Sequence, residues 1–329
     1  MPYHVFVALL LILTGCSQTD AQRGLGEAEL TRVARILDAE PPPDITVDPR
    51  VRTEIAVPPF SEARIGFTKA LSLGECGLVP LIAERNSALG RQKAASTRFI
   101  YEWRIWEGLM ACQTQFADEP WFQTALLEKR LDVDIAVQAV LFQSIEADAV
   151  QSALSASFSD LKLSGAAYRD AWSRISPLLI QALQGGPSPT QAEHDAFEAA
   201  LKHWGDTRHH AALGRAVRQT DAWLQAANAL LQDAKAANRI CPMGTPTAEG
   251  RQIAAFVRGY FASSIQSEVA TVMQSVEGFD ALWRPLRSAS PTIAKAATTD
   301  DLLLLAPGST AALKQRWQSH VESWQAILQ

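Results

Sequence analysis

The chain has 329 residues, of which 47% are apolar and 20% are charged. With 18 glycines and 17 prolines, this is the composition of an ordinary globular protein, which argues against a disordered chain, a collagen-like fibre and a polytopic membrane protein. Its 30 basic and 35 acidic residues give a formal charge of −5. A chain with this acidic balance lacks the positive surface of a general nucleic-acid binder, so we expect no nucleic-acid partner.

The N-terminus carries the pattern of an export signal. Residues 5–13 form an unbroken apolar run, VFVALLLIL, which is much shorter than the roughly 20 residues of a membrane-spanning helix. Leu13-Thr14-Gly15-Cys16 follows and resembles a bacterial lipobox, although the first four residues, MPYH, contain no lysine or arginine. We therefore predict a lipoprotein signal peptide over residues 1–15. The alternative is a buried apolar strand followed by an incidental cysteine.

The lipobox resemblance implies that the thiol of Cys16 receives diacylglycerol and that the mature chain begins there with three acyl chains, such as palmitate. Each chain contributes roughly 0.8 kcal/mol per buried methylene, so three chains anchor a protein permanently. In lipoproteins of this kind an aspartate after the cysteine favours the inner membrane, whereas this chain has Ser17. We expect a lipid-anchored protein of the outer membrane that faces the periplasm, with residues 16–24 as a polar tether.

Three further cysteines would lie in the oxidising periplasm: Cys76, Cys112 and Cys241. An odd number permits at most one internal disulfide and leaves one thiol over, and none of the spacings is that of a metal site. Residues 77–89 are predicted to form the first arm of a helical hairpin, and Ser96 opens the second arm. Since about 13 residues run one way and about 16 return, Cys76 and Cys112 reach the same end. We predict a disulfide between these two.

Helical periodicity dominates the rest of the chain. A run of three prolines stops the first helix, and residues 41–60 are predicted to be extended and to wrap the body. Helices are expected over about 119–131 and about 134–154, and the serine-rich stretch 155–165 is a candidate hinge between two lobes. Without a convincing strand pair, the sequence predicts an all-α, multi-helix bundle over residues 25–329.

The second half of the sequence contains clear helix boundaries. Thr190 and Glu193 have the spacing of a capping box, and Pro246 is suited to the first turn of a further helix. Near-heptad apolar spacing from Thr207 over about 27 residues predicts the longest helix of the chain. The last helix is predicted to begin near Ser309.

Most familiar catalytic signatures are absent from the sequence, among them the G-x-S-x-G elbow, H-E-x-x-H and the Walker loop. Ser159 and Lys162 have S-x-x-K spacing, but the K-T-G partner motif is missing, so a chance match is favoured. A solvated helix junction is favoured over a metal site for a cluster of His203, Asp206, His209 and His210. We predict no catalytic residue, no metal site and no cofactor.

Histidine and tryptophan on helical stripes are expected to pack inside the protein. His320 lies between Trp317 and Trp324, where an interface histidine bonded to a carbonyl is favoured over a general base. Most of the nine tryptophans stand beside apolar residues at helical spacing, so core packing is favoured over exposed platforms for sugar rings.

The most suggestive polar cluster follows the apolar run CGLVPLIA and consists of Glu84, Arg85, Asn86 and Ser87. Successive helical residues point in different directions, so these four side chains do not all line one small pocket. A structural network is favoured, in which Glu84 or Arg85 pairs across the hairpin and the other two bond loop backbone. The four residues are nevertheless the best candidate site in the sequence.

The same segment resembles a known protein family. Residues 75–90, ECGLVPLIAERNSALG, look like the signature of the Domain of Unknown Function 3080 proteins, which are predicted lipoproteins of Gram-negative bacteria. Weaker similarity over the mature chain involves Tyr101-Glu102 with Cys112, Cys241-Pro242, and Trp317, His320 and Trp324. The resemblance implies a lipoprotein without an assigned activity, so it transfers no functional residue.

These observations lead to three functional hypotheses. The acyl anchor, the helical body and the lack of a catalytic constellation favour a non-enzymatic binding or scaffolding protein of the cell envelope, with an envelope protein as a potential partner. An alternative is an envelope hydrolase acting on peptidoglycan-like substrates, with Glu84 as general acid or base and Arg85 binding an anionic group. A third is a carrier of apolar ligands held between helices.

Overall fold

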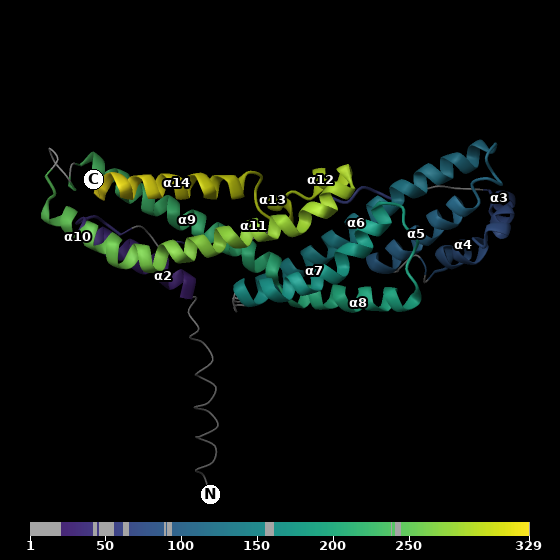
Figure 1. Cartoon of the computed structure of the whole chain (residues 1–329), viewed down its shortest axis with the longest axis horizontal. Coiled ribbons are helices and arrows are strands. Elements are labelled where there is room, and N and C mark those ends of the chain that lie inside the picture. Colours follow the sequence, from purple (N-terminus) through teal and green to yellow (C-terminus); the bar gives the residue numbers. More distant parts are fainter. Residues whose placement is uncertain are drawn as a thin grey trace, which may run out of the picture.

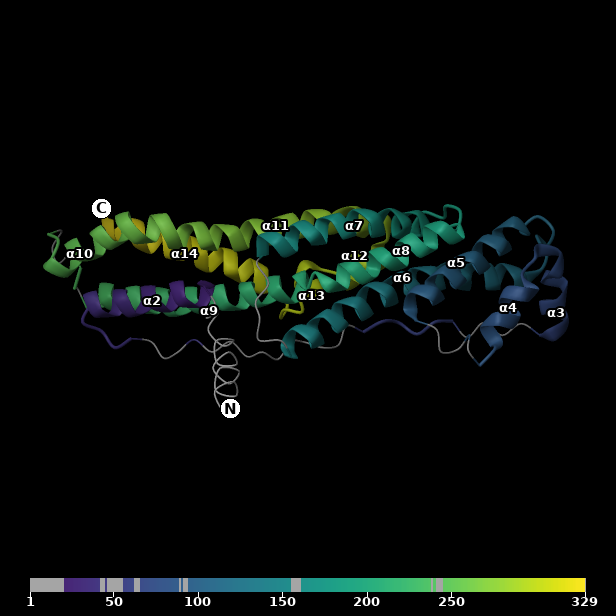
Figure 2. The same cartoon turned by 90° about the horizontal axis from the view of Figure 1, so that it is seen from below.

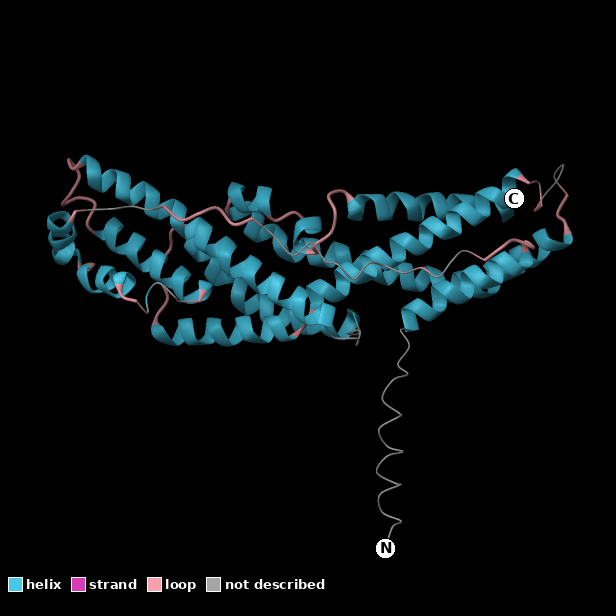
Figure 3. Cartoon of the chain, turned by 180° about the vertical axis from the view of Figure 1, so that it is seen from behind, coloured by secondary structure: helices cyan, strands magenta, loops and turns pink. Residues whose placement is uncertain are grey.

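A computed structural model describes residues 21–41, 45, 56–61, 66–88, 90, 94–154, 161–237, 239–240 and 245–328. These residues form helices joined by loops, and none of them forms a strand (Figure 3), which confirms the all-α prediction. The elements are, in chain order, α2 (Ala21–Ile36), α3 (Phe67–Ser72), the 3₁₀-helix η1 (Leu73–Cys76), α4 (Val79–Asn86), α5 (Ala95–Ala111), α6 (Pro120–Leu154), α7 (Leu161–Leu183), α8 (Gln191–Asp206), α9 (His209–Ala236), α10 (Ala248–Phe256), the π-helix η4 (Val257–Ile265), α11 (Gln266–Ala289), α12 (Pro291–Ala296), α13 (Thr299–Leu302) and α14 (Ser309–Leu328).

The helices pack into an elongated multi-helix bundle (Figure 1). At one end α9 packs against both α14 and α2, and α10 also contacts α2. The middle is built from α6, α7, α8 and the C-terminal part of α11 (Figure 2). At the opposite end α5 packs along α6, with α3 and α4 beside them. The first and last helices therefore share one end of the molecule, and α3 to α5 form the other.

Large aromatic side chains fill the middle of the bundle. Trp172 and Trp283 stack with their ring centroids 4.2 Å apart, and Trp283 Nε1 donates to the hydroxyl of Tyr168 at 2.7 Å. Of the nine tryptophans, all except Trp121 and Trp317 are buried. Their burial confirms the expected role of the tryptophans in core packing. A buried indole contributes a large apolar surface, and its N–H usually finds a hydrogen-bond acceptor.

Capping residues define the starts of α8 and α10. Thr190 accepts a hydrogen bond from the backbone N–H of Glu193, and the Glu193 carboxylate accepts from the Thr190 N–H at 2.8 Å, so the predicted capping box is confirmed. The prediction that Pro246 lies in a first helical turn is wrong. Thr247 is the N-cap of α10 because its hydroxyl accepts from the Gly250 N–H at 2.9 Å, which leaves Pro246 outside the helix.

The longest helix is α6, which is continuous over 35 residues, whereas α9 has 28. The predicted break within this segment is therefore wrong, and so is the prediction that α9 is the longest. Two aspartates disfavour a helix locally at this point. Both are held by cations one turn earlier, since Lys129 pairs with Asp132 at 2.8 Å and Arg130 with Asp134 at 2.9 Å. Ser61 also donates to Asp132, which secures the helix from outside.

The first helix begins earlier than predicted. Residues 21–24, the last part of the expected tether over residues 16–24, form the first turn of α2. Alanine, glutamine and arginine at its start are good helix formers, which explains the early start. Within the described part of the chain, no helix has both the length and the apolar character needed to cross a membrane.

Several predicted features lie outside the described residues. They are the signal peptide over 1–15, the lipidated Cys16, the thiol of Cys241 and residues 155–160 of the candidate hinge. The last part of that hinge, residues 161–165, belongs to the helix α7.

The proline-rich segment is described over residues 56–61, which are not helical. Ser61 donates to Asp132 from its backbone N–H at 2.7 Å and from its hydroxyl at 2.6 Å. The guanidinium of Arg98 lies 3.3 Å from the ring centroid of Phe60. For these described residues, the prediction that the segment wraps the helical body is confirmed.

A disulfide joins Cys76 to Cys112, with their α-carbons 5.8 Å apart, which confirms the predicted pair. Cys76 is the last residue of η1, and Cys112 follows the last turn of α5. The helix α4 is shorter than the predicted arm over 77–89, because Ser87 ends it in an extended conformation. The bond fastens α3, η1 and α4 to the end of α5.

His320 is buried between α14 and α9. Its Nδ1 lies 2.7 Å from Asn228 Oδ1, and its Nε2 accepts a hydrogen bond from Trp324 Nε1 at 2.9 Å. Because an indole N–H only donates, Nε2 carries no proton and the ring is neutral, with Nδ1 as the donor. Burial lowers the pKa of His320 to about 3. The predicted interface histidine is confirmed, and its carbonyl partner is a side-chain amide.

This buried imidazole makes the stability depend on pH. An unfolded histidine binds a proton near pH 6.5, whereas folded His320 does so only near a pKa of about 3, so its contribution is present above about pH 6.5 and is lost as the pH falls towards 3. In His320→Gln, the slope of the unfolding free energy against pH should be smaller by about 1.4 kcal/mol per unit between about pH 5.5 and 4. Urea unfolding at a series of pH values measures the slope.

The matched control is His203→Gln, which replaces an exposed histidine on α8 and should keep the wild-type slope. Equal slopes for His320→Gln and the wild type would contradict a neutral buried imidazole.

Candidate functional site

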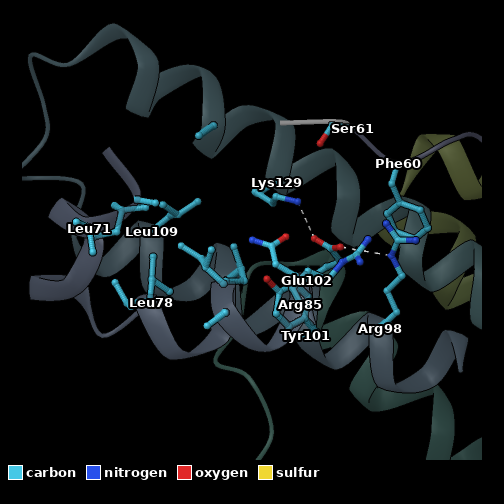
Figure 4. Close-up of a pocket in the computed structure, with 18 of the residues that line it drawn as sticks. Phe60, Ser61, Leu71, Leu78, Arg85, Arg98, Tyr101, Glu102, Leu109 and Lys129 are labelled. Atoms are coloured by element: carbon cyan, nitrogen blue, oxygen red, sulfur yellow. Dashed lines mark hydrogen bonds and ion pairs between the residues drawn. The ribbon is translucent and has the colours of Figure 1, made fainter. Parts of the chain in front are cut away.

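A groove with a volume of about 1060 Å³ lies at the α3 end of the bundle (Figure 4). One wall is formed by α3, η1 and α4, the other by α5 and α6, and Phe60 and Ser61 lie at one end of it. The two ends differ in chemistry: Figure 4 shows the apolar Leu71, Leu78 and Leu109 at one end, and Arg85, Arg98, Glu102 and Lys129 towards the other.

Helical spacing explains this mixed lining. The lining residues of α5 recur at intervals of three or four, so they lie on one face of the helix. They are Arg98, Tyr101, Glu102, Ile105 and Leu109. On α6, Ala125 and Lys129 are one turn apart and face the same space. The charged part of the groove is thus the first half of the α5 face, and the apolar part is its second half.

A buried carboxylate organises the charged end. Glu102 is 1% exposed and accepts from Lys129 Nζ at 2.9 Å and from Arg98 Nε at 3.4 Å. Lys129 also binds Asp132, at 2.8 Å. Burial lowers the pKa of Lys129, but Glu102 and Asp132 outweigh that effect and the pKa is raised overall. Burial lowers the pKa of Arg98 despite the neighbouring Glu102. The four charged side chains form one network across α5 and α6.

Arg85 adds a positive charge that this network does not neutralise. It is half-buried in the groove and makes no hydrogen bond or ion pair with another residue of the described ranges. The charge of Arg85 acts on Tyr101. Burial and Glu102 raise the pKa of the Tyr101 hydroxyl, and Arg85 opposes that rise. With Arg98 and Lys129 there are three cations against the two carboxylates of Glu102 and Asp132. Glu84, which also acts on Tyr101, is exposed and lies outside the groove lining, so within the groove and its ion-pair network the cations outnumber the carboxylates.

The apolar end is open to solvent. The side chains of Phe67 and Leu71 on α3 are 77% and 52% exposed, although both line the groove. Behind them Leu73 and Leu78 are buried. Large exposed apolar side chains beside a groove are a feature of binding surfaces, since water contact with them costs free energy that a ligand would remove.

The structure brings only half of the predicted polar cluster into the groove. Arg85 and Asn86 line it, whereas Glu84 and Ser87 are exposed and lie outside the lining. Ser87 closes the helix end, because its hydroxyl donates to the Glu84 carbonyl at 2.7 Å and accepts from the Gly90 N–H at 2.9 Å. For Ser87, the structural alternative proposed from the sequence is confirmed.

Arg98, Glu102 and Lys129 were not identified from the sequence as site residues. Glu102 stands between tryptophan and tyrosine in a segment that reads as a helix with a solvated charged face. One feature of the sequence could have indicated these residues. Arg98 and Glu102 are four residues apart, and Lys129 and Asp132 are three apart, so each pair has the spacing of an ion pair within a largely apolar helix. That they meet depends on the packing of α5 against α6, which no local pattern specifies.

The histidine cluster does not form a ligand set. His203 and Asp206 are exposed at the end of α8, whereas His209 and His210 are buried at the start of α9. His210 Nδ1 lies 3.1 Å from the backbone carbonyl of Leu302. Within the described ranges, no three histidine, cysteine, aspartate or glutamate side chains come together in a way that could hold a metal ion.

The groove geometry suits binding rather than acid–base chemistry. The oxygens of Glu102 accept hydrogen bonds from two cations, so the carboxylate is occupied in holding them. A guanidinium that faces an apolar groove is suited to an oxyanion, which it binds in a bidentate manner. The site therefore fits a molecule that has an apolar part and an anionic group.

Comparisons with known proteins place this fold in a family. Residues 28–329 match the family described as Protein of unknown function (DUF3080). No curated protein and no solved structure matches the chain. The match covers nearly the whole chain and includes every helix from α3 to α14. The family resemblance of residues 75–90 is thereby confirmed, and the chain belongs to the DUF3080 family.

Proposed function

We propose that this protein is a lipid-anchored component of the bacterial outer membrane, facing the periplasm, that binds an anionic amphiphile in the groove between α4 and α5. The proposal of a lipid anchor is supported by the lipobox-like residues 13–16, and the proposal of the outer membrane by Ser17. The binding role combines the expected non-enzymatic function with the expected carrier of apolar ligands.

One observation carries the binding role: a single groove has an open apolar end and a charged end in which the guanidinium of Arg85 has no partner among the described residues. Its volume of about 1060 Å³ is that of a site for a small molecule with a hydrocarbon chain. An apolar chain along Leu71, Leu78 and Leu109 would leave water, while its anionic group would meet Arg85. Neither an uncharged lipid nor a small inorganic ion would use both ends.

The hydrolase alternative has less support from the geometry. It requires Glu84 to face a substrate, and this side chain is exposed on α4 outside the groove lining. A protein partner remains compatible with the exposed apolar end of the groove, and the same experiment addresses it.

The experiment measures displacement of cis-parinaric acid, a fluorescent fatty acid, by dodecanoate and by 1-dodecanol. The protein is the mature chain with Cys16→Ser, which retains all residues of the body and lacks only the acyl chains. Arg85→Gln should weaken the affinity for dodecanoate by about tenfold or more, since a hydrogen bond to a charged group contributes about 1.5–3 kcal/mol. The affinity for dodecanol should not change.

The matched control is Glu84→Gln on the same helix, an exposed side chain outside the groove lining, which should weaken neither affinity. If neither compound displaces the probe from the wild type, the groove does not bind amphiphiles and a protein partner becomes the better hypothesis. Equal losses for the acid and the alcohol in Arg85→Gln would contradict the anionic specificity.

A further inference from the structure

A second cavity lies between α7 and α11, above the first residue of α9. It has a volume of about 470 Å³, and none of its lining residues belongs to the groove. Figure 1 shows α7 and α11 side by side in the middle of the bundle, and the two helices are in contact. Small residues leave the space between them, with Gly165 on α7 and Ala270 and Gly278 on α11.

His209 forms part of the cavity floor. It is buried, its ring lies 5.0 Å from that of Tyr168, and its Nδ1 lies 3.0 Å from Ser164 Oγ. Burial and, to a smaller extent, the charge of Arg169 lower the pKa of His209 to about 4, so the ring is neutral near pH 7.

The hydrogen bond of Ser164 determines which nitrogen of His209 carries the proton. The serine hydroxyl lies 3.0 Å from Nδ1 and 3.4 Å from the carbonyl of Leu161, and it has one proton to donate to one of these two acceptors. A neutral imidazole with an accepting Nδ1 is protonated at Nε2. In the tautomer in which Ser164 donates to Nδ1, His209 presents an Nε2–H donor on the side of the cavity, and an oxyanion bound there favours this tautomer.

The guanidinium of Arg169 lies close to the same part of the cavity as His209 Nε2. A side-chain carbon added at Gly165 would lie 3.6 Å from His209 Nε2 and 3.7 Å from Arg169 Nη1. A methyl group at this position would be in van der Waals contact with both nitrogens, and the glycine leaves that space open. Arg169 makes no hydrogen bond or ion pair with any other residue that the structure describes. Lys162 also lines the cavity, and none of the described lining residues is acidic.

The remaining lining residues indicate which other groups a ligand of this cavity would have. Gln274 and Ser267 on α11 add polar groups, whereas Phe279 and Leu282 form an apolar side. The cavity is larger than an inorganic oxyanion needs and lies within the size range of small-molecule sites. A guanidinium together with an imidazole N–H suits an oxyanion, because both present donors and neither adds negative charge.

We propose that the cavity between α7 and α11 binds a small organic oxyanion, a phosphate or carboxylate with a compact apolar group, through Arg169 and His209 Nε2. The oxyanion lies over Gly165, and the apolar group lies against Phe279 and Leu282. This site is separate from the groove and does not depend on the function proposed for it.

The test uses phenyl phosphate and inorganic phosphate as probes, with the mature chain carrying Cys16→Ser. Calorimetry measures affinity, and ¹⁵N NMR of the labelled histidines follows the Nε2 resonance of His209. Phenyl phosphate should bind more tightly than inorganic phosphate and should shift the Nε2 signal. Arg169→Gln should weaken the affinity for phenyl phosphate by about tenfold, and its exposed position should leave folding intact.

Arg174→Gln is the matched control, because this exposed arginine of the same helix pairs with Asp170 and does not line the cavity. It should bind phenyl phosphate as the wild type does. Equal losses in Arg169→Gln and Arg174→Gln would show attraction to surface charge only and would overturn the site. The site is also overturned if the Nε2 signal of His209 does not respond to phenyl phosphate. Inorganic phosphate binding as tightly as phenyl phosphate would overturn the organic ligand.

Discussion

Replacing Glu102 with alanine is expected to lower the free energy of unfolding by about 3–5 kcal/mol. The carboxylate is 1% exposed and binds both Lys129 and Arg98, so its removal leaves two cations partly buried with fewer partners. Breaking a buried ion pair by deleting one member costs this much because the remaining charge cannot be solvated. Urea unfolding of the mature chain measures the loss.

Glu107→Ala is the control on the same helix, since Glu107 forms no hydrogen bond or ion pair within the described ranges and lies outside the groove lining. It should change the stability by no more than about 0.5 kcal/mol. A similar small loss for Glu102→Ala would show that the network does not stabilise the fold.

For ligand affinity, neutralising Glu102 is expected to have the opposite effect, a gain rather than a loss. Glu102→Gln keeps the shape of the side chain and removes the charge that partly neutralises Lys129 and Arg98. The affinity for dodecanoate should therefore rise, while the affinity for dodecanol stays the same. A variant that is less stable yet binds the anion more tightly would separate the structural role of Glu102 from the binding role of the cations.

Loss of the disulfide should cost about 4 kcal/mol. On the chain-entropy model, a bond that closes a 36-residue interval removes this much conformational freedom from the unfolded chain. The double variant Cys76→Ala, Cys112→Ala should show the full loss in urea unfolding. It also removes the fastening of α3, η1 and α4 to α5, so that one groove wall should become less well ordered.

A reducing agent supplies the control for this variant. The wild type should lose stability when it is reduced, whereas the double variant should be insensitive to the reductant. If the wild type is equally stable with and without reductant, the bond does not stabilise the fold.

The hairpin shows what a sequence can specify about this fold. The pairing of Cys76 with Cys112 followed from the fixed rise of a helix and the number of residues in each arm. Local rules of this kind also identified the capping box at Thr190 and the buried tryptophans. These features depend on residues within a few helical turns, so the local sequence is enough to predict them.

Predictions that depended on distant residues were less successful. The continuity of α6 past Asp132 depends on Ser61, 71 residues earlier in the chain. The π-helix from Val257 to Ile265 was not foreseen, because its apolar spacing is close to that of an α-helix. In the site, the sequence singled out Arg85 and Asn86, but Glu102 becomes buried only through the packing of α5 on α6.

The position of α2 has a consequence for how the protein is made. Arg239 donates hydrogen bonds to the carbonyls of Leu37 and Asp38, just after α2, at 2.7 and 3.0 Å, and the first pair is separated by 202 residues. At roughly 5–20 residues per second, about 10–40 s pass between synthesis of α2 and synthesis of its partners. The apolar face of the first helix must remain without its packing partners for that time. The end of the bundle that holds α2 therefore closes only after α9 and α10 have been made.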